Sequence, residues 1–222
     1  MNFVLLQTLA ALILPAYFLG SIPFGLIIGK LQGIDVREHG SGNIGATNVW
    51  RVLGPKWGGL TFLLDAAKGF FAVSLAQQIA WRQAAPPALE DQYLAYAGVF
   101  AALACILGHS FPVWLRFKGG KGVATSLGVI IGLMPPLAIG VVLAIWISIF
   151  AFFRYVSLAS IIAALSLPAT VGILLRMGEL DGSAYFAFSC AAAFLVIRRH
   201  RDNIRRLFAG TENRFGSPKK VQ

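Results

Sequence analysis

Three polar segments of this sequence combine residue types that bind phosphate groups. The first joins closely spaced glycines to hydroxyl and amide side chains: Gly40, Ser41, Gly42, Asn43, Gly45, Thr47 and Asn48. Such glycines permit backbone conformations in which successive N–H groups face one point, and the residues after them have the pattern of a helix start, which attracts anions. Arg51 follows, and its forked guanidinium matches phosphate oxygens. The segment predicts a phosphate site, with a flexible loop as the alternative.

The second segment places two lysines among glycines, with polar residues on either side: His109, Lys118, Gly119, Gly120, Lys121, Gly122 and Thr125. It concentrates positive charge and backbone N–H groups beside the start of an apolar helix. Charges that only orient the chain in a membrane would need the lysines but not the glycines. We therefore predict a second phosphate-binding segment, with orienting charges as the alternative.

The third segment is basic and contains His200 and Asn203, which are three residues apart and so share a helical face. A neutral imidazole acts as a base or a donor near pH 7, although a surface histidine is the alternative. The surrounding arginines are expected mostly to bind lipid headgroups. This segment predicts a histidine and an amide that reach one ligand.

Asp65 and Lys68 are charged residues inside an otherwise apolar run. At positions i and i+3 they can pair, which lowers the cost of placing charge in lipid. A structural ion pair is the favoured interpretation, with Lys68 as a lining residue of the same pocket as the alternative. His109 lies in another apolar run, where an interhelical hydrogen bond is as good an interpretation as catalysis.

Several kinds of chemistry are excluded by what the sequence lacks. No acidic cluster would hold a metal ion, and Cys105 and Cys190 lie in separate apolar runs, where buried thiols are expected. None of the three histidines is followed five positions later by aspartate, which excludes a His–Asp base pair of the kind used by soluble acyltransferases. We predict no metal and no cofactor.

The elements that must position these segments are membrane helices. Of 222 residues, 57% are apolar and only 13% are charged, which excludes a soluble domain. Uncharged or nearly uncharged runs cover residues 3–29, 57–81, 93–115, 123–153, 155–175 and 183–197. Each is expected to be helical, because the short alternating segments of a membrane barrel are absent.

The number of crossings depends on the run 123–153, which as one helix would be about 46 Å long. Pro135 and Pro136 predict a break, which leaves a short half-span over 123–134. Seven crossings with the N-terminus outside then put nearly all Lys and Arg residues inside and leave Arg82 and Arg176 outside, as the positive-inside rule favours. We predict an all-α integral membrane protein with seven transmembrane helices, a cytoplasmic C-terminus and one domain, 1–222. Five spans are the minor alternative.

Four motifs together resemble one family: G-S-G-N-I-G-A-T-N-x-x-R, L-D-x-x-K-G, G-H-x-x-P with F-K-G-G-K-G-V-A-T, and H-x-x-N-I-x-R-L. They occur in the order found in the bacterial acyl-phosphate:glycerol-3-phosphate acyltransferases, which are small inner-membrane enzymes. The resemblance implies that an acyl phosphate gives its acyl group to the 1-hydroxyl of sn-glycerol 3-phosphate, with lysophosphatidate and phosphate as products. It also implies that neither acyl-CoA nor acyl carrier protein is used.

The resemblance also implies roles for individual residues. By similarity, glycerol phosphate is held by Arg51, Lys121, His200 and Asn203. Ser41, Asn43 and the neighbouring glycines would hold the acyl phosphate, and Ser157 matches a recurrent family position. The five residues expected to carry catalysis are Lys121, Ser41, Arg51, His200 and Asn203.

These expectations combine into one hypothesis. The three segments fold together on the cytoplasmic face of a bacterial inner membrane into one electropositive site. There the hydroxyl attacks the acyl carbonyl directly, without an acyl-enzyme, while Lys121 and nearby N–H groups stabilise the departing phosphate. His200 or a phosphate oxygen accepts the proton. The partners are the two substrates and the bilayer, not nucleic acid, and a monomer is the working hypothesis. A transporter or flippase for a phosphorylated lipid or small anion is the alternative.

Overall fold

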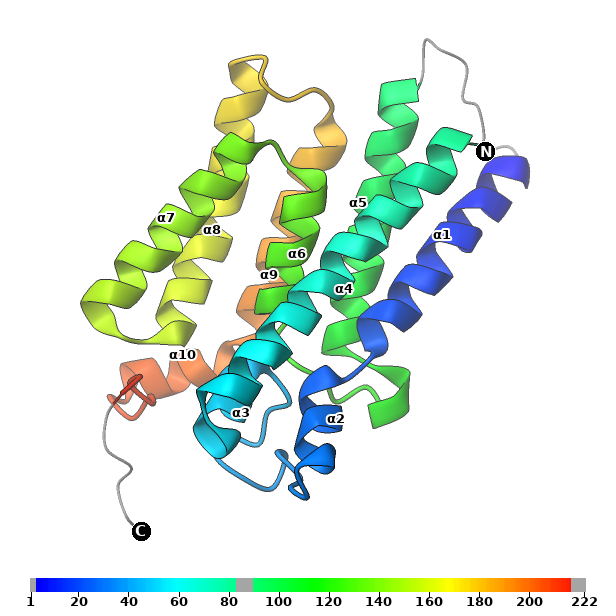
Figure 1. Cartoon of the computed structure of the whole chain (residues 1–222). Coiled ribbons are helices and arrows are strands. Elements are labelled where there is room, and N and C mark those ends of the chain that lie inside the picture. The colour runs from blue at the N-terminus through cyan, green and yellow to red at the C-terminus, as the bar shows by residue number, and fades with distance from the viewer. Residues whose placement is uncertain (1–2, 83–89, 217–222) are drawn as a thin grey trace. The chain divides into compact units, whose positions relative to one another are not determined.

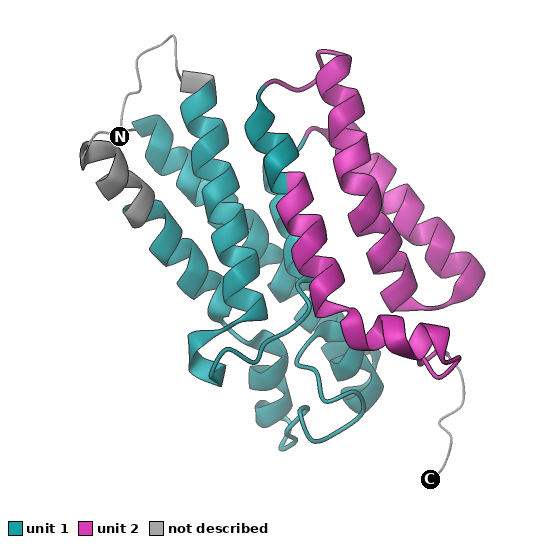
Figure 2. Cartoon of the chain, turned by 180° about the vertical axis from the view of Figure 1, so that it is seen from behind, with its two compact units in different colours: residues 1–134, 182–188 teal, residues 135–181, 189–222 magenta. Residues whose placement is uncertain are grey.

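The structure is a computed structural model that describes residues 3–82 and 90–216, with side chains from residue 11 to 82 and from 92 to 216. All regular elements in these ranges are helical, as predicted (Figure 1). The chain divides into two compact units (Figure 2). Unit 1 comprises Met1–Met134 and Gly182–Phe188, and unit 2 comprises Pro135–Asp181 and Ser189–Gln222. The single domain 1–222 stays a prediction.

Unit 1 contains the helices that precede Pro135. These are α1 Phe3–Ser21, α2 Phe24–Leu31, α3 Ala46–Leu53, α4 Pro55–Arg82, α5 Glu90–Ser110, the short 3₁₀ helix η2 Val113–Leu115 and α6 Val123–Leu133. Within this unit, α1 packs on α5, and α4 packs on both α5 and α6.

Unit 2 contains the C-terminal helices. These are α7 Pro136–Phe153, α8 Val156–Arg176, the greater part of α9 Ser183–Arg199, and α10 Arg201–Phe208. Helix α7 packs along α8, and α10 packs against α8. The first residues of α9 belong to unit 1.

Prolines interrupt two of the apolar runs. The predicted break in the run 123–153 is confirmed, because α6 ends at Leu133 and α7 begins at Pro136. The run 3–29 differs from the expectation of one helix, since it consists of α1 and α2 with a break at Ile22 and Pro23. Proline lacks an amide hydrogen and disfavours helical geometry at the preceding residue, so the helical hydrogen bonds stop there.

Glycines allow α4 and α6 to approach closely. Gly69 lies against the backbone carbonyl of Thr125, and Gly128 lies against the carbonyl of Ala66. A β-carbon at either position would overlap the opposing backbone, so only glycine permits this spacing. The start of α6 is thereby held against the middle of α4.

Five segments among the described residues are long and apolar enough to cross a membrane: Ala11–Leu31, Pro55–Arg82, Gln92–Leu115, Pro136–Phe153 and Val156–Arg176. Helix α6 is apolar but shorter. Cys190, expected to be buried, is instead exposed on α9, whereas Cys105 is buried. The expectation for Cys190 was wrong because the side chains of an apolar helix also face outward, where lipid replaces a protein core.

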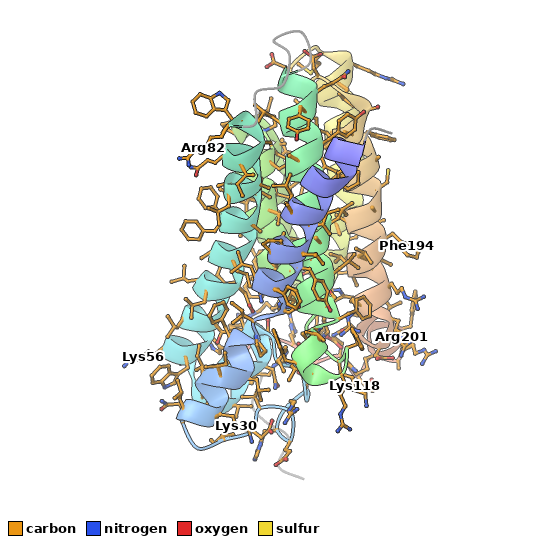
Figure 3. The ribbon with its side chains drawn as sticks, turned by 90° about the vertical axis from the view of Figure 1, so that its right-hand side faces the viewer. Lys30, Lys56, Arg82, Lys118, Phe194 and Arg201 are labelled. Atoms are coloured by element: carbon orange, nitrogen blue, oxygen red, sulfur yellow. The ribbon has the colours of Figure 1, made fainter. Side chains whose placement is uncertain are left out.

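The basic residues of unit 1 are distributed unevenly. Figure 3 shows Lys30, Lys56 and Lys118 at one end of this unit and Arg82 at the opposite end. We call the first of these the basic end of unit 1. The loops before α3 and α6 lie at this end as well (Figure 1).

Candidate active site

The loop between α2 and α3 is shaped by glycines, as the sequence predicted. Gly40 and Gly42 have φ values of +63° and +67°, a region that side chains with a β-carbon rarely occupy. The loop ends at Gly45, which is the N-cap of α3, so a helix does begin directly after the glycines. The Asn43 side chain accepts a hydrogen bond from the Gly45 N–H at 2.9 Å and sets this turn.

Asn48 supports this loop from the inside. Its Nδ2 donates to the carbonyl oxygens of Val36 at 2.8 Å and His39 at 3.1 Å, and its Oδ1 accepts the Ser41 N–H at 2.7 Å. Both amide hydrogens and the amide oxygen therefore have partners in the loop. Asn48 was predicted as a donor to phosphate, but these contacts occupy its side chain. Ser41 is exposed, and Thr47 and Arg51 are half-buried on the same face of α3.

Asp35 anchors the beginning of the loop and was missed by the sequence analysis. Its Oδ2 lies 2.6 Å from Arg37 Nη2 and 2.9 Å from Lys30 Nζ. Hydrogen bonds from Arg37 and Lys30 hold the pKa of the Asp35 carboxyl well below its usual range. The acidic residue between two basic ones in a polar loop was the available signal for this anchor.

The loop between α5 and α6 carries the second segment. The Gly119 N–H donates to the Ser110 carbonyl at 3.2 Å, and the Gly120 N–H donates to the His109 carbonyl at 3.0 Å. These two N–H groups, expected to face phosphate, are therefore bonded to the last turn of α5. The structure requires glycine here for another reason: a β-carbon at Gly119 would meet the His109 carbonyl, and one at Gly120 would meet the His109 ring.

Lys121 lies at the end of this loop, directly before α6. Gly122 is the N-cap of α6 and has a left-handed φ of +81°. Lys121 is half-buried and Lys118 is exposed. The Thr125 hydroxyl in the first turn of α6 is buried and has no hydrogen-bond partner among the described residues, which is unusual for a buried hydroxyl. This arrangement combines a cation, a helix N-terminus and a hydroxyl, which suits an anion.

One apolar cluster supports both loops of unit 1. Its buried members are Leu26, Ile28, Val36, Ile44 and Val49, and Leu115 packs against it. Ile44 and Val49 belong to the first segment, and Leu115 belongs to η2 in the loop that carries the second. Packing on a common cluster thus brings the first two polar segments to the same end of unit 1.

The Lys68 side chain is buried and has three partners in unit 1. Its Nζ lies 2.7 Å from Asp65 Oδ1, 2.9 Å from the Ile22 carbonyl oxygen and 3.0 Å from His109 Nδ1. The predicted pairing of Asp65 with Lys68 is confirmed. His109 joins the pair, which the sequence analysis did not foresee.

Unit 2 contains a cluster around Glu212. The Ser157 hydroxyl and the Asn203 amide donate to Oε1 at 2.8 and 2.7 Å, and Arg206 Nε lies 2.8 Å from Oε2. Burial acts to raise the pKa of the Glu212 carboxyl, but hydrogen bonds from Asn203, Ser157 and Arg206 outweigh it, so the pKa lies below its ordinary value. Glu212 connects α8, α10 and the following segment. The sequence analysis predicted no role for Glu212.

His200 lies in unit 2 at the junction of α9 and α10. It is buried, and its Nδ1 lies 2.8 Å from the Val196 carbonyl oxygen. A carbonyl only accepts hydrogen bonds, so Nδ1 of His200 carries a proton. Asn203 is buried as well, and its Oδ1 has no hydrogen-bond partner in the described part of the chain.

With this geometry established, comparison with known proteins identifies the family. The family model described as glycerol-3-phosphate acyltransferase matches residues 10–210. The chain belongs to the glycerol-3-phosphate acyltransferase family. This acyltransferase is 47% identical over 204 residues to the glycerol-3-phosphate acyltransferase of Geotalea daltonii, with 92% of this chain and 96% of the relative covered.

A solved structure supports the same assignment. The crystal structure of PlsY (YgiH), an integral membrane glycerol 3-phosphate acyltransferase in its glycerol 3-phosphate form, is 42% identical to this chain, with a TM-score of 0.80 and coverage of 94% of this chain and 96% of that one. Its lysophosphatidic acid form gives a TM-score of 0.78. The acyltransferase is therefore an integral membrane enzyme, and the transporter alternative is set aside.

The predicted site residues of the acyltransferase fall into the two units. Unit 1 holds Gly40, Ser41, Gly42, Asn43, Gly45, Thr47, Asn48, Arg51, Lys68, His109, Lys118, Gly119, Gly120, Lys121, Gly122 and Thr125. Unit 2 holds Ser157, His200 and Asn203. Within unit 1 the first two segments share one end, as predicted. That the third segment joins them stays a prediction.

Proposed function

We propose that this acyltransferase uses an acyl phosphate as donor and the 1-hydroxyl of sn-glycerol 3-phosphate as acceptor. The observation that carries the proposal is the basic end of unit 1, where the loop with the left-handed glycines and the loop that leads to Lys121 share one apolar cluster through Ile44 and Leu115. A donor and an acceptor that both carry phosphate suit a site with two anion-binding loops. The glycerol 3-phosphate and lysophosphatidic acid forms of the related PlsY agree with this acceptor and its acylated product.

The transfer proceeds by direct attack in our proposal. The acceptor oxygen forms a bond to the acyl carbon, and the bond from that carbon to the phosphate oxygen breaks, so phosphate leaves with its electron pair. Because an acyl phosphate is a mixed anhydride with a good leaving group, positioning and charge neutralisation supply most of the rate enhancement. Lys121 and Arg51 neutralise phosphate charge, and Ser41 and Asn43 help to orient the donor. No acyl-enzyme and no cofactor are required.

The proton of the attacking hydroxyl has two candidate acceptors. One is Nε2 of His200, which accepts a proton when the imidazole is neutral, because Nδ1 then holds the ring proton donated to Val196. The other is a phosphate oxygen of a bound substrate. A His200→Gln variant decides between them, since loss of a base lowers kcat, whereas loss of a binding contact raises KM for glycerol 3-phosphate.

The proposed topology has seven membrane crossings, which include α9 and count α6 as a half-span. The N-terminus lies outside, and the C-terminus lies in the cytoplasm of a bacterial cell. The lysines at the basic end of unit 1 support it, because cytoplasmic loops are enriched in Lys and Arg (Figure 3). Lys56→Cys and Arg82→Cys, in a Cys190→Ser background that removes the exposed thiol, test it. An impermeant maleimide added to intact spheroplasts should label position 82 only, and labelling of position 56 would contradict the topology.

Phosphate release by the purified enzyme tests the proposed reaction. In detergent micelles, palmitoyl phosphate should release phosphate only when glycerol 3-phosphate is added, and lysophosphatidate should form in equal amount. Acyl-CoA serves as a parallel donor and should give no product. Product formation with acyl-CoA as the donor would contradict the proposed acyl phosphate donor. We also expect the monomeric enzyme to be active.

A further inference from the structure

A fully buried cluster of ionisable side chains in unit 1 consists of Asp65, Lys68 and His109. Their side chains are 3%, 1% and 5% exposed. A lysine ammonium has three N–H bonds, and three acceptor atoms lie within 3.0 Å of Nζ: Asp65 Oδ1, the Ile22 carbonyl oxygen and His109 Nδ1. Lys68 is thus held by three protein groups: an ion pair with Asp65 and hydrogen bonds to the Ile22 carbonyl and His109 Nδ1.

The contact with Lys68 orients the His109 ring and makes Nδ1 its acceptor atom. An ammonium group only donates hydrogen bonds, so Nδ1 of His109 must accept at 3.0 Å and carries no proton. The distance from Nδ1 to Asp65 Oδ1 is 3.6 Å, too long for a direct hydrogen bond. With Lys68 as an ammonium, this geometry corresponds to the His109 tautomer that carries its proton on Nε2.

The other edge of His109 faces the loop that leads to Lys121. A β-carbon added to Gly120 would meet Nε2, Cε1 and Cδ2 of the His109 ring, so the ring lies against the Gly120 backbone. The His109 carbonyl also accepts the Gly120 N–H at 3.0 Å. Both the ring and the main chain of His109 therefore hold the residue that immediately precedes Lys121.

Lys68 connects this loop to the break between α1 and α2. Because Pro23 interrupts the helix, the Ile22 carbonyl accepts the Phe24 N–H at 3.1 Å outside a helical ladder, and Lys68 also donates to it at 2.9 Å. The Phe24 ring adds a cation–π contact, with Nζ 5.6 Å from its centroid. Three elements that are distant in sequence thus meet at one ammonium group.

We propose that Asp65, Lys68 and His109 form a positioning network for Lys121 and that none of the three touches substrate. Asp65 holds the Lys68 ammonium, Lys68 orients the His109 ring, and His109 supports the loop at Gly120. This inference rests on the proposed function in one respect, because Lys121 is taken as the residue that neutralises the phosphate. It replaces the sequence-based hypothesis that Lys68 and His109 bind substrate.

The kinetic test uses the double variant Asp65→Asn/Lys68→Met. Replacing Lys68 alone would leave a buried unpaired carboxylate and could unfold the protein, whereas the double variant removes both charges. Misplacement of Lys121 should lower kcat about 10- to 100-fold, while KM for glycerol 3-phosphate changes less than about threefold. Lys56→Met, an exposed lysine on the same helix, is the control and should retain wild-type kinetics. Wild-type kcat in the double variant, or a rise in KM alone, would overturn the proposal.

Hydrogen exchange provides a readout that does not depend on activity. The buried Gly119 and Gly120 amides are bonded to the end of α5 and should be protected in the wild-type enzyme. In the double variant, exchange over residues 117–122 should accelerate at least about tenfold, while peptides from the rest of α4 and from α6 stay protected. Unchanged exchange in the loop, or equal acceleration throughout unit 1, would contradict a positioning role.

Combination with His109 variants tests the order of the network. His109→Ala is combined with the double variant and compared with each of the two alone. If Lys68 acts through His109, kcat of the combination should be no lower than kcat of the more impaired of the two. In the enzyme that keeps Lys68, His109→Asn should retain more activity than His109→Ala, because an amide oxygen can replace Nδ1 as the acceptor for the Lys68 ammonium. Additive losses would mean that the residues act independently. Absence of phosphate release by the wild-type enzyme would refute the proposed reaction instead, and the exchange experiment would still test the network.

Discussion

The imidazole ring of His109 lies against the backbone of Gly120, so closely that a β-carbon at position 120 would overlap its Nε2 atom. This contact joins the last turn of α5 to the loop that carries Lys121. It explains why glycine occupies position 120 without invoking a contact between its N–H group and substrate.

Gly120→Ala should therefore impair the enzyme through the loop. The added methyl group must displace the His109 ring or the loop backbone, so kcat/KM should fall about 10- to 100-fold, and overpacking should lower the free energy of unfolding by about 1–3 kcal/mol. Steady-state phosphate release and thermal unfolding in detergent measure the two effects. Gly59→Ala on α4 is the control, because a β-carbon there has no neighbour within 4 Å, and it should be neutral or slightly stabilising. Equal behaviour of the two variants would contradict the overlap.

Lys121→Ala should abolish most activity without unfolding the protein. Removal of one preorganised charge that stabilises a departing anion typically costs about 10²- to 10³-fold in kcat. Lys121 is only half-buried, so the unfolding temperature should change little. Lys56→Ala, which removes an exposed lysine at the same end of unit 1, should keep full activity (Figure 3). Full turnover by Lys121→Ala would remove this residue from the site.

Asn48→Ala should destabilise the loop before α3. The change removes the hydrogen-bond partner of the Ser41 N–H and of the Val36 carbonyl, whereas the His39 carbonyl keeps the Gly42 N–H. A buried group left unsatisfied costs about 1–3 kcal/mol. The unfolding temperature should fall and both KM values should rise, because the loop no longer holds its shape. The exposed Asn213→Ala is the control. A normal unfolding temperature combined with a selective KM effect would indicate that Asn48 contacts substrate instead.

Glu212 should make stability depend on pH in the acidic range. Because its pKa is lower in the folded state than its ordinary value of 4.5, ionised Glu212 stabilises the fold above that value, and this contribution is lost as pH falls through the lowered pKa. Glu212→Gln should unfold at a lower temperature than wild type at pH 7, and the difference should shrink below about pH 4.5. Thermal unfolding from pH 7 to pH 3 measures this, with the exposed Asp202→Asn as control. A difference that is constant with pH would show that Glu212 contributes no charge-dependent stability.

Much of the fold follows from local composition and was predicted from the sequence. Apolar runs fit membrane helices because lipid leaves no other partner for the backbone, and Pro135 and Pro136 mark the break between α6 and α7 because proline cannot continue a helix. The break at Pro23 carried the same signal but was overlooked. The left-handed glycines Gly40, Gly42 and Gly122 were likewise visible as glycine-rich segments.

The functions of individual polar residues depended on partners far away in the chain. Lys68 was assignable to an ion pair with Asp65 from their spacing, but its contacts with Ile22 and His109 join residues more than 40 positions apart. The same holds for Ser157 and Glu212. Residue type tells how many hydrogen bonds a side chain can make, and only packing decides which atoms receive them. The sequence by itself thus determined the membrane-helix class, the family motifs and the phosphate-binding residue types. The tertiary structure decided which of those residues bond to other groups inside the protein. The reason is that a buried polar group must pair with whichever group the packed helices place next to it.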